Sequence, residues 1–241
     1  MVPSLSIVVP AFNEALRLPA SLSAITAWMD TCGLDVELIV VDDGSHDDTA
    51  AIVDAANRSD PRVRLHRMVR NRGKGAAVRA GALAATKEWV LISDADLSTP
   101  IEEVERLAAA AVARGVPVAI GSRDVPDSDI QDHQPWYREA MGRTFNRIVQ
   151  ALAVPGVHDT QCGFKLIRAD AARAVFGLAT VDGFAFDVEM LYLARRLGFA
   201  IVEVGVRWRN DQRSTVDPIR DSAKMFLDVL KIRYRHRRRV G

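Results

Sequence analysis

The chain has 241 residues, of which 49% are hydrophobic and 26% are charged. This composition is typical of a packed α/β domain and excludes intrinsic disorder over most of the length. The 32 Lys and Arg residues balance the 31 Asp and Glu residues, which argues against a protein that coats nucleic acid with its whole surface. No apolar run approaches the about 20 residues that span a bilayer, and no signal peptide is predicted. The two cysteines, Cys32 and Cys162, cannot build a disulfide framework or a four-ligand zinc site, so we expect a reducing, cytoplasmic compartment.

Short apolar runs rich in Val and Ile predict six strands. They are Leu5–Pro10, Val36–Asp42, Val63–His66, Trp89–Asp94, Val116–Gly121 and Ala200–Val206. Helical patterns separate the first five of these runs, at Glu14–Asp30, Asp47–Asn57, Gly75–Thr86 and Pro100–Arg114. Because strands and helices alternate, we expect an α/β fold with a mostly parallel central sheet flanked by helices.

The alternation stops after Gly121. The segment Asp124–Pro135 contains four Asp, two Pro and no apolar run, which predicts a long loop of the kind that often serves as a lid. Helical patterns then follow at Trp136–Ala153, Ala169–Phe176 and Phe186–Leu197. We predict one domain over residues 1–215 and a separate helix over residues 216–241.

The carboxyl-terminal segment has the pattern of an amphipathic helix with a basic end. Lys231–Arg239 is strongly basic, so the rest of the chain is net acidic. The apolar face consists of Ile219, Ala223, Phe226, Leu227, Leu230 and Tyr234, with Arg220, Lys224, Lys231 and Arg235 around it. Two interpretations are open: a helix packed on the core with a solvated basic end, or a helix that binds a membrane surface.

Polar clusters follow four of the predicted strands. They are Pro10–Glu14, Asp42–Ser45, Asp94–Asp96 and Gly121–Arg123. One such cluster is readily explained as a helix cap. Four of them at the carboxyl ends of strands in one sheet are better explained by a shared ligand, because ligands of open α/β sheets bind at that edge.

The pair Asp94 and Asp96 has the spacing to hold a hard divalent cation, which in turn binds phosphate oxygens. A lone Asp-x-Asp is more often two solvated turn residues. Its position at a strand end, beside other acids, favours a metal or nucleotide site here.

The segment Asn71–Gly75 precedes a helix and combines two glycines with Arg72 and Lys74. Glycines permit close approach of the backbone, and a helix amino terminus with cationic side chains favours an anion. The spacing is not that of a Walker A loop, and no G-x-G-x-x-G follows the first strand. The alternative is a turn with a solvated lysine.

Taken in order, these motifs resemble those of the family 2 glycosyltransferases of the GT-A fold. Within that family the chain looks most like the dolichyl-phosphate β-glucosyltransferases and their bacterial polyprenyl-phosphate relatives. The segments that carry the resemblance are Val9–Glu14, Val41–Ser45, Asn71–Gly75, Asp94–Asp96, Gly121–Arg123, Asp159–Lys165 and Phe184–Glu189. The first four are general to the family, whereas Asp159–Lys165 points to the glucosyl-phosphate-lipid branch.

The resemblance implies a donor site and a metal site. Pro10, Phe12, Glu14 and Asp43 would bind the nucleoside, with Asp43 at the base edge. Asp94 would lie by the ribose, while Arg72 and Lys74 would lie near the donor end of the cleft. Asp96, with Asp94 beside it, would bind the Mg²⁺ or Mn²⁺ that bridges the donor diphosphate.

The resemblance also implies an acceptor site. Arg123, Arg138 and Lys165 are the candidates for binding the acceptor phosphate, and Asp96, Asp187 and Arg123 are the candidates for catalysis. Asp187 and Glu189 could orient the acceptor or the sugar hydroxyls, or act as a base toward an alcohol. Their alternative interpretation is a pair of carboxylates at a helix amino terminus.

The resulting expectation is a metal-dependent, inverting transfer of a hexose, most simply glucose from UDP-glucose, to a polyprenyl or dolichyl phosphate. The enzyme would be peripheral at the cytoplasmic face of a membrane, bound through its carboxyl-terminal helix, with no nucleic-acid partner. Two alternatives stay open: a polyprenyl-phosphate mannosyltransferase that uses GDP-mannose, and a non-catalytic sugar-nucleotide-binding protein that docks on membranes.

Overall fold

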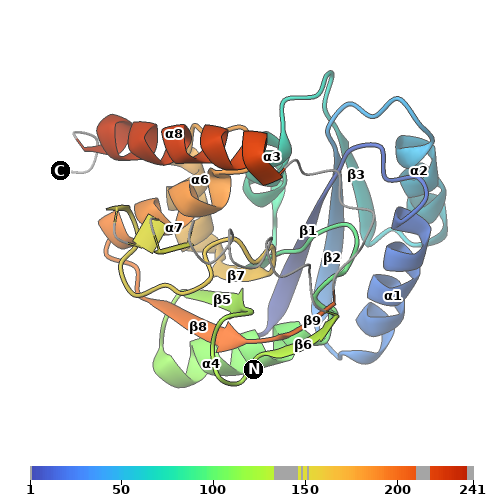
Figure 1. Ribbon diagram of the computed structural model, residues 1–241. Coiled ribbons are helices and arrows are strands. Elements are labelled where there is room, and N and C mark those ends of the chain that lie inside the picture. The colour runs from blue at the N-terminus through green and yellow to red at the C-terminus, as the bar shows by residue number, and fades with distance from the viewer. Residues whose placement is uncertain (1, 133–145, 148, 151, 210–217, 238–241) are drawn as a thin grey trace.

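The fold is taken from a computed structural model, which describes residues 2–132, 146–147, 149–150, 152–209 and 218–237. In the last helix, side chains are described from Met225 onward. Within these residues the chain forms a three-layer α/β structure with one large sheet and a separate two-stranded sheet (Figure 1).

The large sheet has seven strands in the order β3-β2-β1-β4-β7-β5-β8. The six predicted strands are present, as β1 (Ser4–Ala11), β2 (Asp35–Asp42), β3 (Val63–Arg67), β4 (Trp89–Ile92), β5 (Val118–Ser122) and β8 (Ile201–Gly205). The sequence patterns did not predict β7 (Lys165–Arg168), which runs antiparallel to β4 and β5. Its four residues are too few to show a period. The other pairs in the sheet are parallel, so the predicted mostly parallel sheet is confirmed.

The helices cover both faces of this sheet (Figure 1). One face carries α1 (Leu18–Thr31), α2 (Thr49–Ser59) and α4 (Glu103–Arg114), and the other carries α3 (Lys74–Ala84), α6 (Ala169–Leu178), α7 (Phe186–Arg196) and α8 (Pro218–His236). Because both faces are covered, alternate residues of β1 enter two different cores. Leu5 and Ile7 pack with α1 and α4, whereas Val8 packs with α3 and α6. This explains why the central strands are almost continuously apolar.

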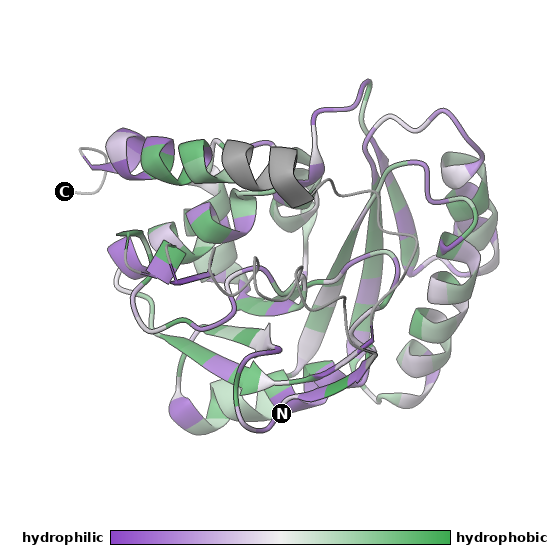
Figure 2. Cartoon of the chain, viewed as in Figure 1, coloured by the Kyte–Doolittle hydropathy of each residue, from purple (hydrophilic) through white to green (hydrophobic). Residues whose placement is uncertain are grey.

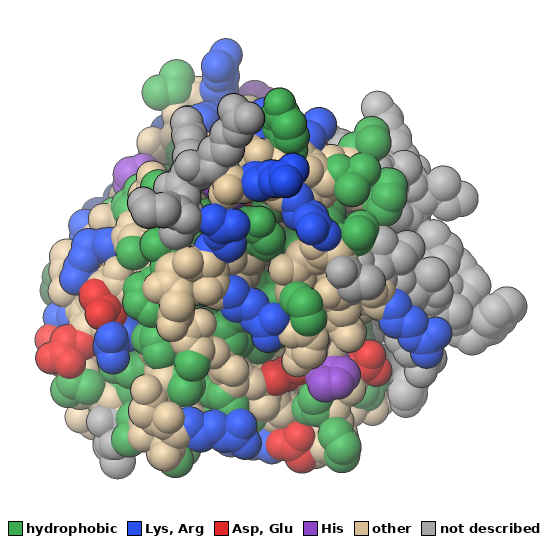
Figure 3. All heavy atoms as spheres, turned by 90° about the vertical axis from the view of Figure 1, so that its left-hand side faces the viewer, with side chains coloured by type: hydrophobic (Ala, Val, Ile, Leu, Met, Phe, Trp, Pro, Cys, Tyr) green, Lys and Arg blue, Asp and Glu red, His purple; other side chains and the backbone are tan. Residues whose placement is uncertain are grey.

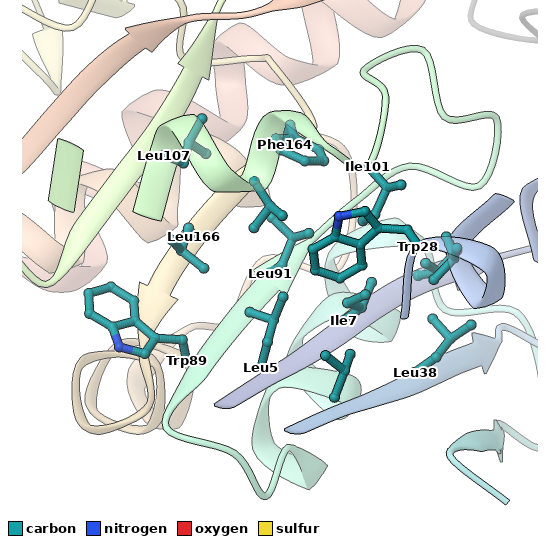
Figure 4. Packing of buried hydrophobic residues seen from close by; sticks show 14 of the residues in the cluster. Leu5, Ile7, Trp28, Leu38, Trp89, Leu91, Ile101, Leu107, Phe164 and Leu166 are labelled. Carbon is teal, nitrogen blue, oxygen red and sulfur yellow. The ribbon is translucent and has the colours of Figure 1, made fainter. Parts of the chain in front are cut away.

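The packing beneath α1 and α4 holds the central strands together (Figure 4). Leu5 and Ile7 of β1 align with Trp89 and Leu91 of β4 in the strand register, and all four side chains are buried. Trp28 of α1 belongs to the same buried cluster. Figure 2 shows the same arrangement as hydropathy, with apolar strands at the centre and polar residues on the outer faces of the helices.

The prediction of one continuous loop over Asp124–Pro135 is wrong in part. Residues Asp129–Asp132 form β6, which pairs in parallel with β9 (Arg207–Arg209). The preceding turn is close-packed, because a Cβ on Gly205 would lie 2.5 Å from the carbonyl carbon of Asp127. Residues 133–135 and much of the predicted helix Trp136–Ala153 lie outside the described residues, and of the latter 146–147, 149–150 and 152 are helical.

The helix α8 lies along the α6–α7 side of the molecule (Figure 1). Its inner face is buried and consists of Val229, Ile232 and His236, with Met225 packed beside them. The predicted apolar residues Phe226, Leu227, Leu230 and Tyr234 instead face outward, and Tyr234 is 83% exposed. The inner face of α8 therefore matches the interpretation of a helix packed on the core. The outer face is the one to which the membrane-binding interpretation applies. No helix in the described part of the chain is both long and apolar enough to cross a bilayer.

Candidate active site

Three of the four strand-end clusters contribute to one cavity of about 730 Å³, beside the carboxyl ends of β1, β2 and β4, whereas Gly121–Arg123 does not line it. All of the residues predicted for the donor and the metal lie in its wall: Pro10, Phe12, Glu14, Asp43, Arg72, Lys74, Asp94 and Asp96. The amino terminus of α3 opens on the same cavity through Gly73 and Lys74. A helix amino terminus beside cationic side chains suits a diphosphate.

Asp94 is held by close contacts on two sides. Its Oδ1 lies 2.6 Å from Nζ of Lys74. Burial alone would raise the pKa of Asp94, but the charge and hydrogen bond of Lys74 outweigh it and lower the pKa, helped by the charges of Lys165 and Arg123. On the other side, a Cβ on Gly163 would lie 2.2 Å from Oδ2 of Asp94. Asp94 is therefore ionised and held between a lysine and a residue that has to be glycine.

Asp96 is the second acid of the pair, and its side chain is 21% exposed. Its Oδ1 accepts a 2.9 Å hydrogen bond from the backbone N–H of Ser98, and its Oδ2 lies 3.9 Å from Nη1 of Arg17. Arg17 also pairs with Glu14, which draws three residues of the cavity wall together.

The acids at this site fit a divalent cation that is shared with a ligand. No cluster of three or more His, Cys, Asp or Glu in metal-binding proximity occurs within the described ranges. Mg²⁺ is commonly held by one or two carboxylates together with substrate phosphates and water. Asp94 and Asp96 are such a donor set, with the remaining positions left to phosphate oxygens.

Asp43 lines the cavity and fixes the loop that carries Arg72. Its two carboxylate oxygens accept backbone hydrogen bonds from Arg72 and Gly73, at 2.8 and 2.7 Å. Gly73 has φ of 111°, and a Cβ there would meet the carbonyl oxygen of Asp182 at 2.5 Å. This close approach explains the glycine between Arg72 and Lys74.

Arg123 lies behind the cavity wall rather than in it. Its guanidinium donates two hydrogen bonds to Asp159, at 2.7 and 2.9 Å, and lies over the ring of Trp208. Burial alone would raise the pKa of Asp159, but the charge and hydrogen bonds of Arg123 outweigh it and lower the pKa to about 2. The motif Asp159–Lys165 thus supplies the partner of Arg123.

Lys165 differs from its predicted place in the site. Its side chain is fully buried, and its ammonium pairs with Asp187 and donates to the carbonyl of Cys162. Burial raises the pKa of Asp187, and the charges of Lys165 and Lys74 offset this only in part. Neither Lys165 nor Asp187 lines the cavity, so in this structure Lys165 does not reach a ligand there. Arg138, the third acceptor candidate, lies outside the described residues.

Several residues of the cavity wall were not predicted from the sequence. They are Arg17, Asp182, Gly183, Met225 and Asp228. A signal existed for Arg17, which follows Glu14 by one helical turn, and for Asp182-Gly183, a turn dipeptide before a helix. Met225 and Asp228 line the cavity because α8 packs against α7. The local sequence pattern does not predict this long-range contact.

The sequence matches the family model for glycosyl transferase family 2 over residues 6–176. It is 36% identical over 243 residues to the dolichyl-phosphate beta-glucosyltransferase of Dictyostelium discoideum, which covers 96% of this chain and 74% of that protein. It is 34% identical over 244 residues to the Homo sapiens protein of the same name, which covers 96% of this chain and 75% of that protein.

Solved structures with the same fold include glucosyl-3-phosphoglycerate synthase from Mycobacterium tuberculosis. Its complex with UDP has a TM-score of 0.72 at 20% identity, covering 95% of this chain and 80% of that chain. Its complex with Mn²⁺, UDP-glucose and phosphoglyceric acid has a TM-score of 0.73 at 20% identity, covering 95% and 79%. The likeness confirms the predicted GT-A fold.

Proposed function

The chain belongs to glycosyl transferase family 2, and from that premise we propose that it transfers glucose from UDP-glucose to a polyprenyl phosphate of the dolichyl type. The observation that carries the proposal is the single cavity in which all of the donor and metal residues predicted from sequence meet. Relatives matched over almost the whole chain are dolichyl-phosphate beta-glucosyltransferases, which supports glucose as the transferred sugar and a polyprenyl phosphate as the acceptor.

The donor diphosphate would lie between the amino terminus of α3 and the acids Asp94 and Asp96. Both acids would hold Mg²⁺ or Mn²⁺ against the diphosphate oxygens, and the metal would offset the charge that develops on the leaving UDP. Arg72 and Lys74 line the same region. Lys74, whose Nζ lies 2.6 Å from Oδ1 of Asp94, would supply positive charge to the diphosphate.

The acceptor supplies its own nucleophile. A phosphate monoester has a second pKa of about 6, so it is largely dianionic at neutral pH and needs no strong general base. Displacement at the anomeric carbon from the face opposite UDP inverts the configuration. The buried Asp187 then serves through its electrostatic contact with Lys165 and Lys74 rather than as a base.

Arg123 is the described cation best suited to the acceptor phosphate. It is fixed by Asp159 at the end of β5, and its charge acts on Asp94. Arg138 stays a prediction for the same role. Lys165 would affect the acceptor phosphate through the electrostatic effect of its charge and not by direct contact.

We further propose that the enzyme works peripherally at the cytoplasmic face of a membrane, with the outer face of α8 toward the lipid. Exposed Leu227, Leu230 and Tyr234 lie on that face among Arg233 and other basic residues. Beside them is an open groove of about 530 Å³, lined by Leu152, Tyr192, Arg196, Leu230, Arg233, Tyr234 and Arg237. Figure 3 views this end of the molecule and shows Lys and Arg spread over its upper and lower parts, with the visible acids in the lower half. Such a surface complements an anionic leaflet.

The proposal is tested by incubating the full chain with UDP-glucose, other UDP-sugars or GDP-mannose, together with a short polyprenyl phosphate and Mn²⁺ or Mg²⁺. We expect UDP-glucose to yield a polyprenyl phosphate that carries glucose. Product from GDP-mannose alone would replace this function with that of a mannosyltransferase. Tight UDP-glucose binding with no product from any donor would indicate a non-catalytic binding protein.

A further inference from the structure

Glu189 of α7 is a buried carboxylate that does not line the donor cavity. Its side chain has no exposed area. Its two oxygens accept hydrogen bonds from the backbone N–H and hydroxyl of Thr180, both at 2.9 Å, and from the backbone N–H of Val181 at 2.7 Å. The carboxylate therefore anchors the start of the segment Thr180–Phe184.

The remaining partner of Glu189 comes from the far end of the chain. His236, in the last turn of α8, is fully buried, and its Nε2 lies 2.7 Å from Oε1 of Glu189. Its Nδ1 has no hydrogen-bond partner within the described part of the chain. We therefore assign the proton to Nε2, which donates to the carboxylate.

The anchored segment forms one wall of the donor cavity. Asp182, Gly183 and Phe184 line that cavity. The carboxylate of Asp182 accepts from Arg72 at 3.0 Å and also from Arg79, and its carbonyl accepts from the N–H of Ala76 in the first turn of α3. The segment thus connects directly to the helix terminus at which the diphosphate would bind.

The packing leaves this wall little freedom. A Cβ on Gly75 would lie 2.5 Å from the carbonyl oxygen of Val181, so α3 and the segment are in close backbone contact. The inner face of α8 adds Met225 and Asp228 to the cavity wall. The wall of the donor cavity is therefore formed jointly by α3, the segment Thr180–Phe184 and α8.

We propose that Glu189 and His236 are positioning residues that join α8 to the Thr180–Phe184 wall, so that the donor site is complete only when the carboxyl-terminal helix is docked. The identity of the donor in this proposal depends on the proposed function, whereas the link between α8 and the wall does not. Because the outer face of α8 is the surface that we propose binds lipid, the same pair would make donor affinity responsive to membrane contact.

The test compares full-length His236→Ala, His236→Gln and His66→Ala with the wild type, without lipid. The glutamine amide can reach the position of Nε2 and donate to Glu189, whereas alanine cannot. His66→Ala is the matched control because it removes a histidine whose side chain is exposed on the edge strand β3. Binding of UDP-glucose with Mn²⁺ and amide hydrogen exchange of residues 180–183 and 76 are measured, together with global unfolding.

We expect His236→Ala to raise the UDP-glucose Kd by about fivefold to twentyfold, the size of effect that follows loss of a buried hydrogen bond to a carboxylate. Exchange should rise at the Thr180 and Val181 amides while the central strands stay protected. His236→Gln should restore both properties, and His66→Ala should match the wild type.

Unchanged exchange at Thr180 and Val181 in His236→Ala would overturn the proposal. Exchange that rises equally across the sheet, or a glutamine variant as impaired as alanine, would also overturn it by showing a role in folding alone. If the wild type fails to bind UDP-glucose, the proposed function fails, and the exchange data still decide whether α8 and the wall are linked.

Discussion

Asp94 shows how much a single glycine contributes to the site. The carboxylate of Asp94 occupies the space that a side chain at position 163 would need, and Lys74 contacts it from the other direction. The position of the Asp94 carboxylate in the site thus depends on the absence of a side chain at Gly163.

Gly163→Ala should therefore displace Asp94. We expect donor affinity in the presence of Mn²⁺ to fall by about tenfold or more, because the new Cβ would overlap the carboxylate at 2.2 Å. Calorimetric titration with UDP measures this. Gly177→Ala is the matched control, since nothing lies within 4 Å of its Cβ position. Equal affinity in both variants would contradict the predicted displacement.

Asp96→Asn should remove metal-dependent binding while leaving the fold intact. The side chain of Asp96 is partly exposed in the cavity, so the change buries no unpaired group. We expect transfer to fall by about a hundredfold or more, since a metal commonly supplies several kcal/mol of transition-state stabilisation. The measurements are transfer rate and UDP affinity with Mn²⁺ and with chelator. Asp54→Asn, an exposed change on α2, is the control, and wild-type turnover in Asp96→Asn would refute the metal assignment.

The pair Arg123–Asp159 makes stability depend on pH. The pKa of Asp159 is lowered to about 2 in the folded protein, whereas an unfolded aspartate titrates near pH 4. Its stabilisation, about 2 kcal/mol, is present above about pH 4 and is lost as the pH falls toward 2. Denaturant unfolding between pH 5 and 2.5 measures this loss. The double variant Arg123→Gln with Asp159→Asn lacks both charges and should lose less stability over that range. An identical slope would show that other acids cause the loss.

Among the elements, α8 has two apolar faces with different roles. The inner face packs on α7, and the outer face presents Leu227, Leu230 and Tyr234 to solvent. Exposed apolar side chains interleaved with arginines are typical of a surface that binds a partner or a membrane.

Substitution on the outer face should reduce membrane binding without unfolding the helix. We expect Leu227→Ser with Leu230→Ser, or Arg233→Gln with Arg237→Gln, to weaken sedimentation with anionic vesicles, and added salt to weaken wild-type binding as well. Each basic residue near an anionic leaflet contributes about 1 kcal/mol. Arg58→Gln with Arg114→Gln changes the net charge equally on the α2 and α4 side and is the control. If both pairs of arginine variants lose binding equally, the attraction depends on net charge and not on α8.

On the scale of the whole molecule, α8 belongs to the folded domain. Ile232 and His236 are buried in the same core as α3, α6 and α7. The boundary near residue 216 stays a prediction, because residues 210–217 lie outside the described part of the chain.

Deletion of Lys231–Gly241 should accordingly impair more than membrane binding. It removes the buried side chains of Ile232 and His236, and loss of a buried Ile side chain alone costs about 2–5 kcal/mol when it leaves a cavity. We expect a lower unfolding midpoint and weaker donor binding than in the outer-face variants. Thermal unfolding and UDP titration measure the two effects. A truncated protein as stable as Leu227→Ser with Leu230→Ser would show that the inner contacts contribute little.

Local sequence patterns were sufficient to predict the alternation of strands and helices and a mostly parallel sheet flanked by helices. They also predicted a site made of Pro10–Glu14, Asp43, Asn71–Lys74 and Asp94–Asp96. These features follow from local periodicity and from the rule that parallel strands end at one edge, so neighbouring residues carry the information. Only the tertiary structure decided that β7 inserts antiparallel between β4 and β5, that Lys165 pairs with Asp187 instead of facing the cavity, and which side of α8 is buried. Each of these depends on partners far away in the chain. Because α8 has apolar residues on two faces, its contacts with α7, among them that between His236 and Glu189, determine which face is buried.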